Sequence, residues 1–239
     1  MPYRTMTLEE VAQYLHLGRR YVEVLVKRNE IPHDLQGERV VFMKRQVDAW
    51  ASQRILGLSD STLARYHKES SAKHHDLSPG HALMPELLDA GRVLAAMHSR
   101  TKASVLGDLV TLADKAELVS DRAELLASLE EREKLCSTAL PGGVALLHPR
   151  NHLPYMFMDS FIALGRLISP VHAGAPDGDP TDLFFLICCQ EDRIHLHILA
   201  RLCTMIRNTA MLGEIRQAGD VREILAAIVT AEEEVIRRL

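Results

Sequence analysis

Apolar residues recur at helical spacing close to the start of the chain. Between residues 8 and 15 they occupy one face of a predicted helix, which Thr7 and Glu10 begin as a capping box. After a break at Leu17–Gly18, a second helix is predicted over Arg19–Arg28, again with one apolar face. The alternating stretch Arg39–Phe42 then predicts one arm of a hairpin, and a third helix follows around residues 47–50.

From residue 85 onward the pattern changes to alternating strands and helices. The predicted strands are apolar at successive positions, which indicates two buried faces; they are Arg92–Met97, Val144–Leu147, Met156–Leu164 (ended by Gly165) and Asp182–Gln190. The predicted helices carry apolar residues at helical spacing and are Lys102–Glu117, Asp121–Arg132, Ile194–Arg207, Leu212–Gln217 and Val221–Leu239. Such strands predict an α/β fold with a sheet that helices cover on both faces.

The stretch Ser52–Pro79 separates the two patterns. It is rich in serine and polar residues, and its apolar periodicity is poor even over Leu63–Glu69. We therefore expect a mobile, partly helical linker, and assign residues 1–54, 55–82 and 83–239 to an N-terminal domain, the linker and a C-terminal domain. Four histidines near this stretch lack the spacing of a metal-binding motif, so no metal site is predicted: His67, His74, His75 and His81.

The charge of the chain is unevenly distributed. Hydrophobic residues make up 47% and charged residues 25% of the 239 residues, as in globular proteins, and the net charge is −4. Residues 1–54 hold nine Lys or Arg against seven Asp or Glu, which gives +2 and leaves −6 for the remainder. This asymmetry indicates two modules with different partners.

The residue pattern gives no indication of membrane insertion, disulfide bonds or cofactor binding. No segment has the length of a membrane span or the form of a signal peptide, so we expect a cytoplasmic protein without membrane insertion. The four cysteines show no CxxC spacing and are interpreted as reduced core residues. No motif calls for a cofactor.

One histidine is distinguished by its position at the end of a predicted buried strand. A charged helix is followed by a turn on Pro141, Gly142 and Gly143, and strand Val144–Leu147 then leads directly to His148. A neutral imidazole held there by its scaffold has a lone pair and can act as a nucleophile. The residues by themselves leave open a second interpretation, in which His148 only caps a backbone group.

The N-terminal elements follow the order of a small winged helix-turn-helix: helix, tight turn, basic helix, hairpin and helix. Residues Thr5–Ala51 resemble the excisionase-type DNA-binding family. The resemblance rests on TLEEVAQYLHLGRRYVEVLVKRNEIP, the hairpin and a helix ending near DAW. It implies that the second helix enters the major groove and that five residues face DNA: Arg19, Arg20, Tyr21, Lys27 and Arg28. Arg39 and Lys44 would contact the phosphate backbone. A net charge of only +2 leaves a second use open, in which these are solvated charges on a module that contacts protein.

Residues from about Leu83 to Val235 resemble the IIA domain of the mannitol/fructose class of the bacterial phosphoenolpyruvate:sugar phosphotransferase system (PTS), including its nitrogen-regulatory relatives. The resemblance rests on REKLCSTALPGGVALLH, GAPDGDPTDLFFLI and HLHILARL in that order. It implies that His148 accepts a phosphoryl group from the small phosphocarrier protein HPr or its nitrogen-branch paralogue. It also implies supporting roles for His195 at a helix N-terminus, for the guanidinium of Arg132 and for the hydroxyl of Thr138.

The loop before His148 departs from that family's pattern. Members usually carry Gly-Ile-Gly where this chain has Ala139-Leu140-Pro141, and proline where it has Leu147. Because alanine and proline do not adopt the positive φ open to glycine, we expect a differently shaped loop here.

The two resemblances together predict a PTS regulator in which the phosphorylation state of His148 acts on DNA binding. Two alternatives stay open: a phosphoryl carrier for a separate sugar permease, and a phosphorylation-incompetent interaction protein. One helix-turn-helix unit reads few base pairs, so DNA binding would require a homodimer or a neighbouring factor.

Overall fold

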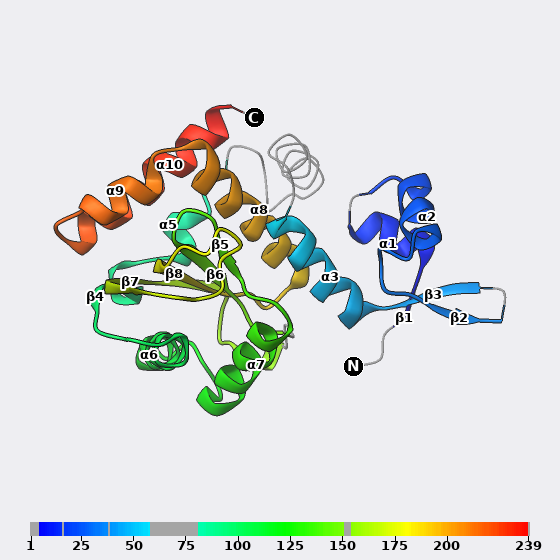
Figure 1. The fold of residues 1–239 in the computed structure, drawn as a ribbon, viewed down its shortest axis with the longest axis horizontal. Coiled ribbons are helices and arrows are strands. Elements are labelled where there is room, and N and C mark those ends of the chain that lie inside the picture. Colours follow the sequence, from blue (N-terminus) through cyan, green and yellow to red (C-terminus); the bar gives the residue numbers. More distant parts are fainter. Residues whose placement is uncertain (1–4, 16, 38, 58–80, 151–153, 239) are drawn as a thin grey trace.

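The chain forms two structural units that helix α3 (Lys44–Leu56) connects (Figure 1). The computed structural model describes residues 5–15, 17–37, 39–57, 81–150 and 154–238. Most of the predicted linker, including Leu63–Glu69 and three of its four histidines, therefore lies outside the described residues.

The N-terminal unit combines three helices with a three-stranded antiparallel sheet. Its elements are β1 (Thr5–Thr7), α1 (Leu8–Tyr14), α2 (Arg19–Lys27), β2 (Asp34–Gln36), β3 (Arg39–Met43) and α3, with strand order β1-β3-β2. The predicted capping box is present, because the Thr7 hydroxyl accepts from the Glu10 N–H and the Glu10 carboxylate accepts from the Thr7 N–H. The sequence pattern did not predict β1, since three residues are too few to show an alternation.

The C-terminal unit is built on a five-stranded mixed sheet. The strands are β4 (Val93–Met97), β5 (Ala139–Leu140), β6 (Val144–Leu147), β7 (Phe161–Val171) and β8 (Thr181–Cys188), in the order β4-β7-β8-β6-β5. The pairs β4–β7 and β6–β8 are parallel, whereas β7–β8 and β5–β6 are antiparallel.

Helices cover this sheet on both faces (Figure 1). One layer holds α6 (Lys102–Lys115) and α7 (Arg122–Leu135); the other holds α5 (Met84–Leu87), α8 (Asp192–Asn208), α9 (Met211–Gln217) and α10 (Val221–Arg237). Two short 3-10 helices, η1 (Ala90–Arg92) and η2 (Pro154–Met156), precede β4 and β7. Along β6 the buried side chains alternate: Val144 and Leu146 pack toward the α8 layer, and Ala145 and Leu147 toward the α6 layer. The predicted α/β fold class is confirmed.

The third predicted strand was placed too early in the chain. Met156 lies in η2, and β7 begins at Phe161 and continues through Gly165 to Val171. Gly165 does not end the strand; a Cβ there would lie 2.0 Å from Met97 Sδ and 3.3 Å from Leu109 Cδ2. The glycine therefore permits a close approach of neighbouring side chains in the middle of a strand.

Helix α3 is longer than the sequence pattern suggested. It continues past Trp50 to Leu56, and its buried residues are Val47, Ala51, Ser52, Ile55 and Leu56. The buried side chains of the N-terminal unit and of the α8 layer form one continuous hydrophobic cluster that includes α3. No helix among the described residues is long and apolar enough to cross a bilayer.

Candidate histidine site

His148 and His195 come together because β6 and β8 are parallel neighbours. Leu147, the last residue of β6, pairs with Leu186 of β8, so both strands end at the same edge of the sheet. His148 follows β6 directly, while β8 leads through a short turn into α8, which carries His195. The centroids of the two imidazole rings lie 4.8 Å apart, and both residues are buried.

The backbone fixes the tautomer of His148. Its Nδ1 lies 2.9 Å from the carbonyl oxygen of Leu146, and a carbonyl can only accept, so Nδ1 carries the proton. Its Nε2 accepts a hydrogen bond of 3.0 Å from Nε of Arg132. The imidazole is therefore neutral, with its lone pair on Nε2 and directed toward Arg132.

Arg132 is a buried cation with unused hydrogen-bonding capacity. It lies on α7, on the sheet face opposite α8, and its Nη1 donates to the carbonyl oxygen of Cys136 at 2.8 Å. Burial lowers the pKa of the Arg132 guanidinium, although Glu133 opposes this shift. Its Nη2 is buried and has no hydrogen-bond partner among the described residues. A buried donor in this state favours an incoming anion.

His195 is placed differently from the sequence expectation. Helix α8 begins at Asp192, earlier than predicted, and the backbone N–H of His195 already donates to the carbonyl oxygen of Glu191 at 3.1 Å. Its own backbone N–H is therefore not offered to a ligand, and its imidazole is the group that faces the site. Nε2 of that imidazole lies 3.4 Å from Oγ of Ser52 in α3.

Thr138 lies at the edge of the site, and its hydroxyl is engaged elsewhere. The hydroxyl donates to the carboxylate of Glu133, which also forms an ion pair with Lys102. The Thr138 carbonyl accepts from the N–H of Leu146 at 3.1 Å, so the residue supports the strand that leads to His148. The hydroxyl is not directed at either imidazole, and its supporting role stays a prediction.

The atypical loop before β6 is a tight hairpin. Ala139 and Leu140 form β5 and pair with β6, and the positive φ values fall on Gly142 (+91°) and Gly143 (+77°). A Cβ on Gly143 would lie 2.8 Å from Nη2 of Arg216. The two glycines that remain in the loop therefore provide the conformations that alanine and proline cannot adopt.

His197 belongs to a separate buried cluster. Its Nε2 lies 3.4 Å from Nη2 of Arg201, and Arg201 forms an ion pair of 2.8 Å with Glu232. Both charged side chains are fully buried. The Glu232 carboxylate also accepts from the N–H groups of Leu83 and Met84 at 2.9 Å each, which anchors the start of the C-terminal unit.

The five residues predicted to face DNA are all exposed, and α2 positions them. Four of them share one face of α2 and its C-terminal end with the exposed Val24: Arg20, Tyr21, Lys27 and Arg28. Arg19 forms ion pairs with Glu9 (3.5 Å) and Glu23 (3.2 Å). Lys44 is different, because it is partly buried and forms ion pairs with Asp48 and Asp192. The structure therefore does not present Lys44 as a phosphate contact.

Sequence reasoning missed the contribution of α3 to the site. Ser52 is 143 residues away from His195, and the sequence pattern placed it at the start of the polar stretch Ser52–Pro79. One signal was present: Val47, Ala51 and Ile55 continue an apolar stripe at spacing four, and a helix with such a stripe has to pack against something. No group of three or more metal-ligating side chains occurs within the described parts of the chain.

Comparisons with known proteins match both units. Residues 86–231 match the family described as "Phosphoenolpyruvate-dependent sugar phosphotransferase system, EIIA 2", and residues 5–54 match the family described as "Helix-turn-helix domain". A nitrogen regulatory protein of Bradyrhizobium diazoefficiens is 30% identical over 145 residues, which are 60% of this chain and 92% of that protein. The fructose-specific PTS EIIABC component of Bacillus subtilis is 29% identical over 145 residues, 60% of this chain but only 22% of that longer protein.

Solved structures of IIA proteins agree with the EIIA 2 match. The nitrogen regulatory protein IIA-Ntr of Neisseria meningitidis aligns with a TM-score of 0.56 and 26% identity, covering 62% of this chain and 99% of that one. IIA mannitol of Escherichia coli aligns with a TM-score of 0.53 and 18% identity, covering 59% and 98%, which shows a shared fold. The resemblance to the IIA family is thus confirmed, and the N-terminal resemblance is confirmed as a helix-turn-helix domain, in the expected order along the chain.

Proposed function

We propose, from the premise that this chain belongs to the phosphoenolpyruvate-dependent sugar phosphotransferase system EIIA 2 family, that His148 accepts a phosphoryl group from an HPr-type phosphocarrier or its nitrogen-branch paralogue. One observation carries the proposal. Nδ1 of His148 carries the proton and donates it in a hydrogen bond to the Leu146 carbonyl oxygen. The nucleophilic lone pair is therefore on Nε2, beside the buried guanidinium of Arg132.

The transfer itself needs no additional base. The Nε2 lone pair forms the bond to phosphorus while the bond from phosphorus to the donor atom breaks, and the donor atom keeps that electron pair. Such a reaction depends on positioning and on neutralisation of the charge on the phosphoryl oxygens. Arg132 can supply both once it releases Nε2, since its Nη2 has no hydrogen-bond partner among the described residues. The imidazole of His195, 4.8 Å away between ring centroids, is the second candidate donor.

The presence of the N-terminal unit favours a regulatory function over a function in sugar uptake. A helix-turn-helix match precedes the IIA-type region in the same chain, and a nitrogen regulatory protein is among the relatives. We therefore propose that the phosphorylation state of His148 modulates DNA binding through the exposed basic face of α2. A carrier serving a separate permease would also become phosphorylated, so only a DNA-binding measurement separates these two functions.

Intact-mass measurement tests the phosphoryl acceptor. The protein is incubated with phosphoenolpyruvate, enzyme I and an HPr-type phosphocarrier, and a gain of about 80 Da that is lost in acid is expected, as for one phosphoryl group on a histidine nitrogen. No gain under conditions that phosphorylate the carrier would contradict the proposal and favour the phosphorylation-incompetent alternative.

DNA binding should depend on the two arginines at the start of α2. The double variant Arg19→Ala/Arg20→Ala should bind promoter fragments more weakly and reduce the slope of log affinity against log salt by about 1 to 2, because each phosphate contact releases about one counterion. Arg222→Ala is the matched control, since this arginine on α10 is 90% exposed and lies outside the N-terminal unit. If the affinity for DNA changes neither with salt nor in the double variant, the proposed DNA-binding role is contradicted.

A further inference from the structure

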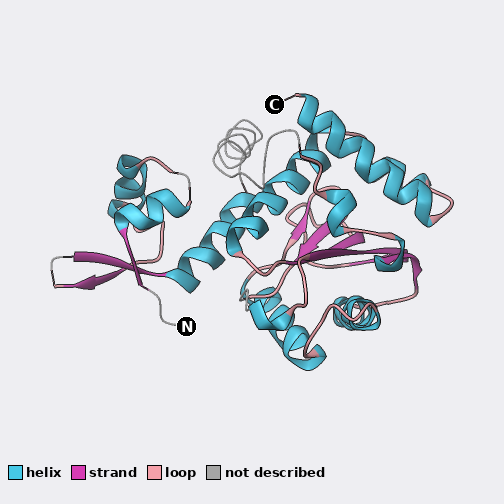
Figure 2. Cartoon of the chain, turned by 180° about the vertical axis from the view of Figure 1, so that it is seen from behind, coloured by secondary structure: helices cyan, strands magenta, loops and turns pink. Residues whose placement is uncertain are grey.

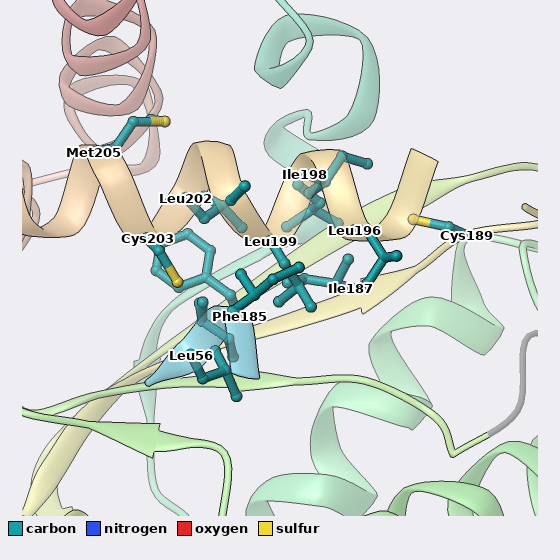
Figure 3. Close-up of a cluster of buried hydrophobic side chains, with 14 of the residues drawn as sticks. Leu56, Phe185, Ile187, Cys189, Leu196, Ile198, Leu199, Leu202, Cys203 and Met205 are labelled. Carbon is teal, nitrogen blue, oxygen red and sulfur yellow. The ribbon is translucent and has the colours of Figure 1, made fainter. Parts of the chain in front are cut away.

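Helix α3 lies alongside α8, the helix that carries His195, in both views of the chain (Figures 1 and 2). At the start of α3, Lys44 forms an ion pair with Asp192 of α8; at its end, the Leu56 carbonyl accepts from Nη2 of Arg207 at 2.9 Å. The two helices therefore run in the same direction. Leu56 lies in one buried cluster with side chains of α8 and β8 (Figure 3).

Ser52 of α3 occupies a hydrogen-bonding position on His195. Its hydroxyl has one proton, which it donates to the carbonyl oxygen of Asp48 at 3.0 Å. In the 3.4 Å contact with Nε2 of His195, Ser52 Oγ is therefore the acceptor and the imidazole N–H is the donor. A phosphoryl oxygen that accepts from the same N–H would have to replace Ser52.

The site is closed to a donor in this arrangement, and Ser52 of α3 takes part in the closure at His195. His148, His195 and Arg132 are each at most 2% exposed, and Ser52 is 3% exposed. A phosphoryl group carried on another protein cannot reach Nε2 of His148 in this arrangement. Because α3 contacts His195 through Ser52, its displacement opens the site on the His195 side.

A compact charge cluster holds the N-terminal end of α3 against α8. Lys44 pairs with Asp48 on its own helix at 3.1 Å and with Asp192 on α8, one helical turn before His195. Burial and the neighbouring Asp192 raise the pKa of the Asp48 carboxyl, although Lys44 and the Tyr14 hydroxyl oppose this. Burial would lower the pKa of Lys44, but Asp48 and Asp192 together raise it. One ammonium thus balances two carboxylates, and the contact depends on that ammonium.

The same helix contacts the predicted DNA-facing helix. Two residues after Ser52, Arg54 donates from Nη2 to the Tyr21 hydroxyl of α2 at 2.5 Å. The Trp50 indole donates to the Glu30 carbonyl, just beyond the end of α2, at 2.5 Å. Within the described residues, α3 is therefore in contact both with His195 and with the helix proposed to read DNA.

We infer that α3 is a displaceable cover of the histidine site, so that docking of α3 on α8 and phosphorylation of His148 exclude each other. This inference rests on the proposed function for its phosphoryl chemistry, and on the Ser52–His195 contact for its geometry. Phosphorylation then undocks from α8 the same helix that carries the Trp50 and Arg54 contacts to the α2 region. By linkage, docking of α3 lowers the equilibrium constant for phosphorylation by the same factor by which phosphorylation lowers the equilibrium constant for docking.

The test uses full-length protein with a charge reversal in the cover. Lys44→Glu puts three carboxylates together and should undock α3, while a glutamate at the first position of a helix is favourable for the helix itself. The matched control is Arg45→Glu, the same charge change at the neighbouring exposed position of α3. A milder second variant, Ser52→Ala, removes only the acceptor for His195. Circular dichroism checks that each variant is folded.

Two measurements separate the cover from the proposed function. The first is the rate at which diethyl pyrocarbonate modifies His148, which needs no phosphoryl transfer; we expect Lys44→Glu to be modified about threefold to tenfold faster than wild type and Arg45→Glu. The second is the rate at which the protein gains the phosphoryl group; this rate should also be higher in Lys44→Glu than in wild type and Arg45→Glu. Ser52→Ala should shift both rates in the same direction by a smaller factor.

The outcomes are distinct. Equal modification rates in Lys44→Glu, Arg45→Glu and wild type would overturn the cover, whatever the phosphorylation result. Faster modification of Lys44→Glu without any phosphoryl gain in any protein would support the cover and contradict the proposed function. Faster modification with an unchanged rate of phosphoryl gain would overturn the exclusion between docking and phosphorylation.

Discussion

Replacing His148 by alanine should abolish phosphoryl uptake completely. The wild-type protein should gain about 80 Da of acid-labile mass from phosphoenolpyruvate, enzyme I and the phosphocarrier, and the variant should gain none. The loss is expected to be complete because alanine removes the Nε2 lone pair itself, whereas the loss of a supporting donor would slow transfer by roughly a hundredfold to a thousandfold. Intact mass before and after acid treatment is the measurement.

The control for this experiment is another buried histidine. His197→Gln removes an imidazole that is as deeply buried as His148 but contacts Arg201 instead of Arg132. It should keep the full mass gain. If His148→Ala still gains the phosphoryl group while folded, the acceptor is a different residue, and His195 becomes the first candidate because its ring lies closest to that of His148 in the described site.

Replacing Glu232 by glutamine should destabilise the protein by about 3–5 kcal/mol, because it removes the carboxylate that pairs with the buried guanidinium of Arg201. The Leu83 and Met84 N–H groups now donate to different oxygens of Glu232, and in glutamine one of these oxygens becomes an NH2 group that cannot accept. This is a large part of the stability of an ordinary domain, which is about 5–15 kcal/mol. Chemical denaturation monitored by circular dichroism measures the change.

The matched control lies two positions further along α10. Glu234→Gln also removes one carboxylate, but its partner Arg238 is 58% exposed, so the expected loss is below about 1 kcal/mol. The double variant Arg201→Met/Glu232→Met should be less destabilised than the sum of its single changes, since it removes the unpaired charge as well. Equal stability of Glu232→Gln and Glu234→Gln would contradict the assignment of a buried, structurally required ion pair.

The sequence predicted helices and strands correctly where the residues that determine them are close together in the chain. The capping box at Thr7, the helix over Arg19–Lys27 and the strand Val144–Leu147 each depend on residues within a few positions of one another, and all three are present. The start and end of β7 did not follow, because Gly165 has the same appearance in a sequence whether it ends a strand or allows Met97 to approach.

The residues of the candidate site could be proposed from the sequence, but the contacts among their side chains could not. His148 was identified from its place after a buried strand, and His195 and Arg132 through the family resemblance. The hydroxyl of Thr138 was expected to face the site, but the structure directs it to Glu133. Which acceptor a hydroxyl finds depends on side-chain packing, and residue spacing does not encode it.

The sequence by itself determined that a histidine ends a strand buried on both faces, and that a basic helix-turn-helix precedes it. Only the tertiary structure decided which groups meet this histidine. His195 reaches it because β6 and β8 are parallel neighbours, and Arg132 reaches it from α7 on the opposite face of the sheet. Ser52 reaches His195 across 143 residues because α3 packs on α8. Such contacts arise from the packing of distant elements, so they are absent from any local pattern of residues.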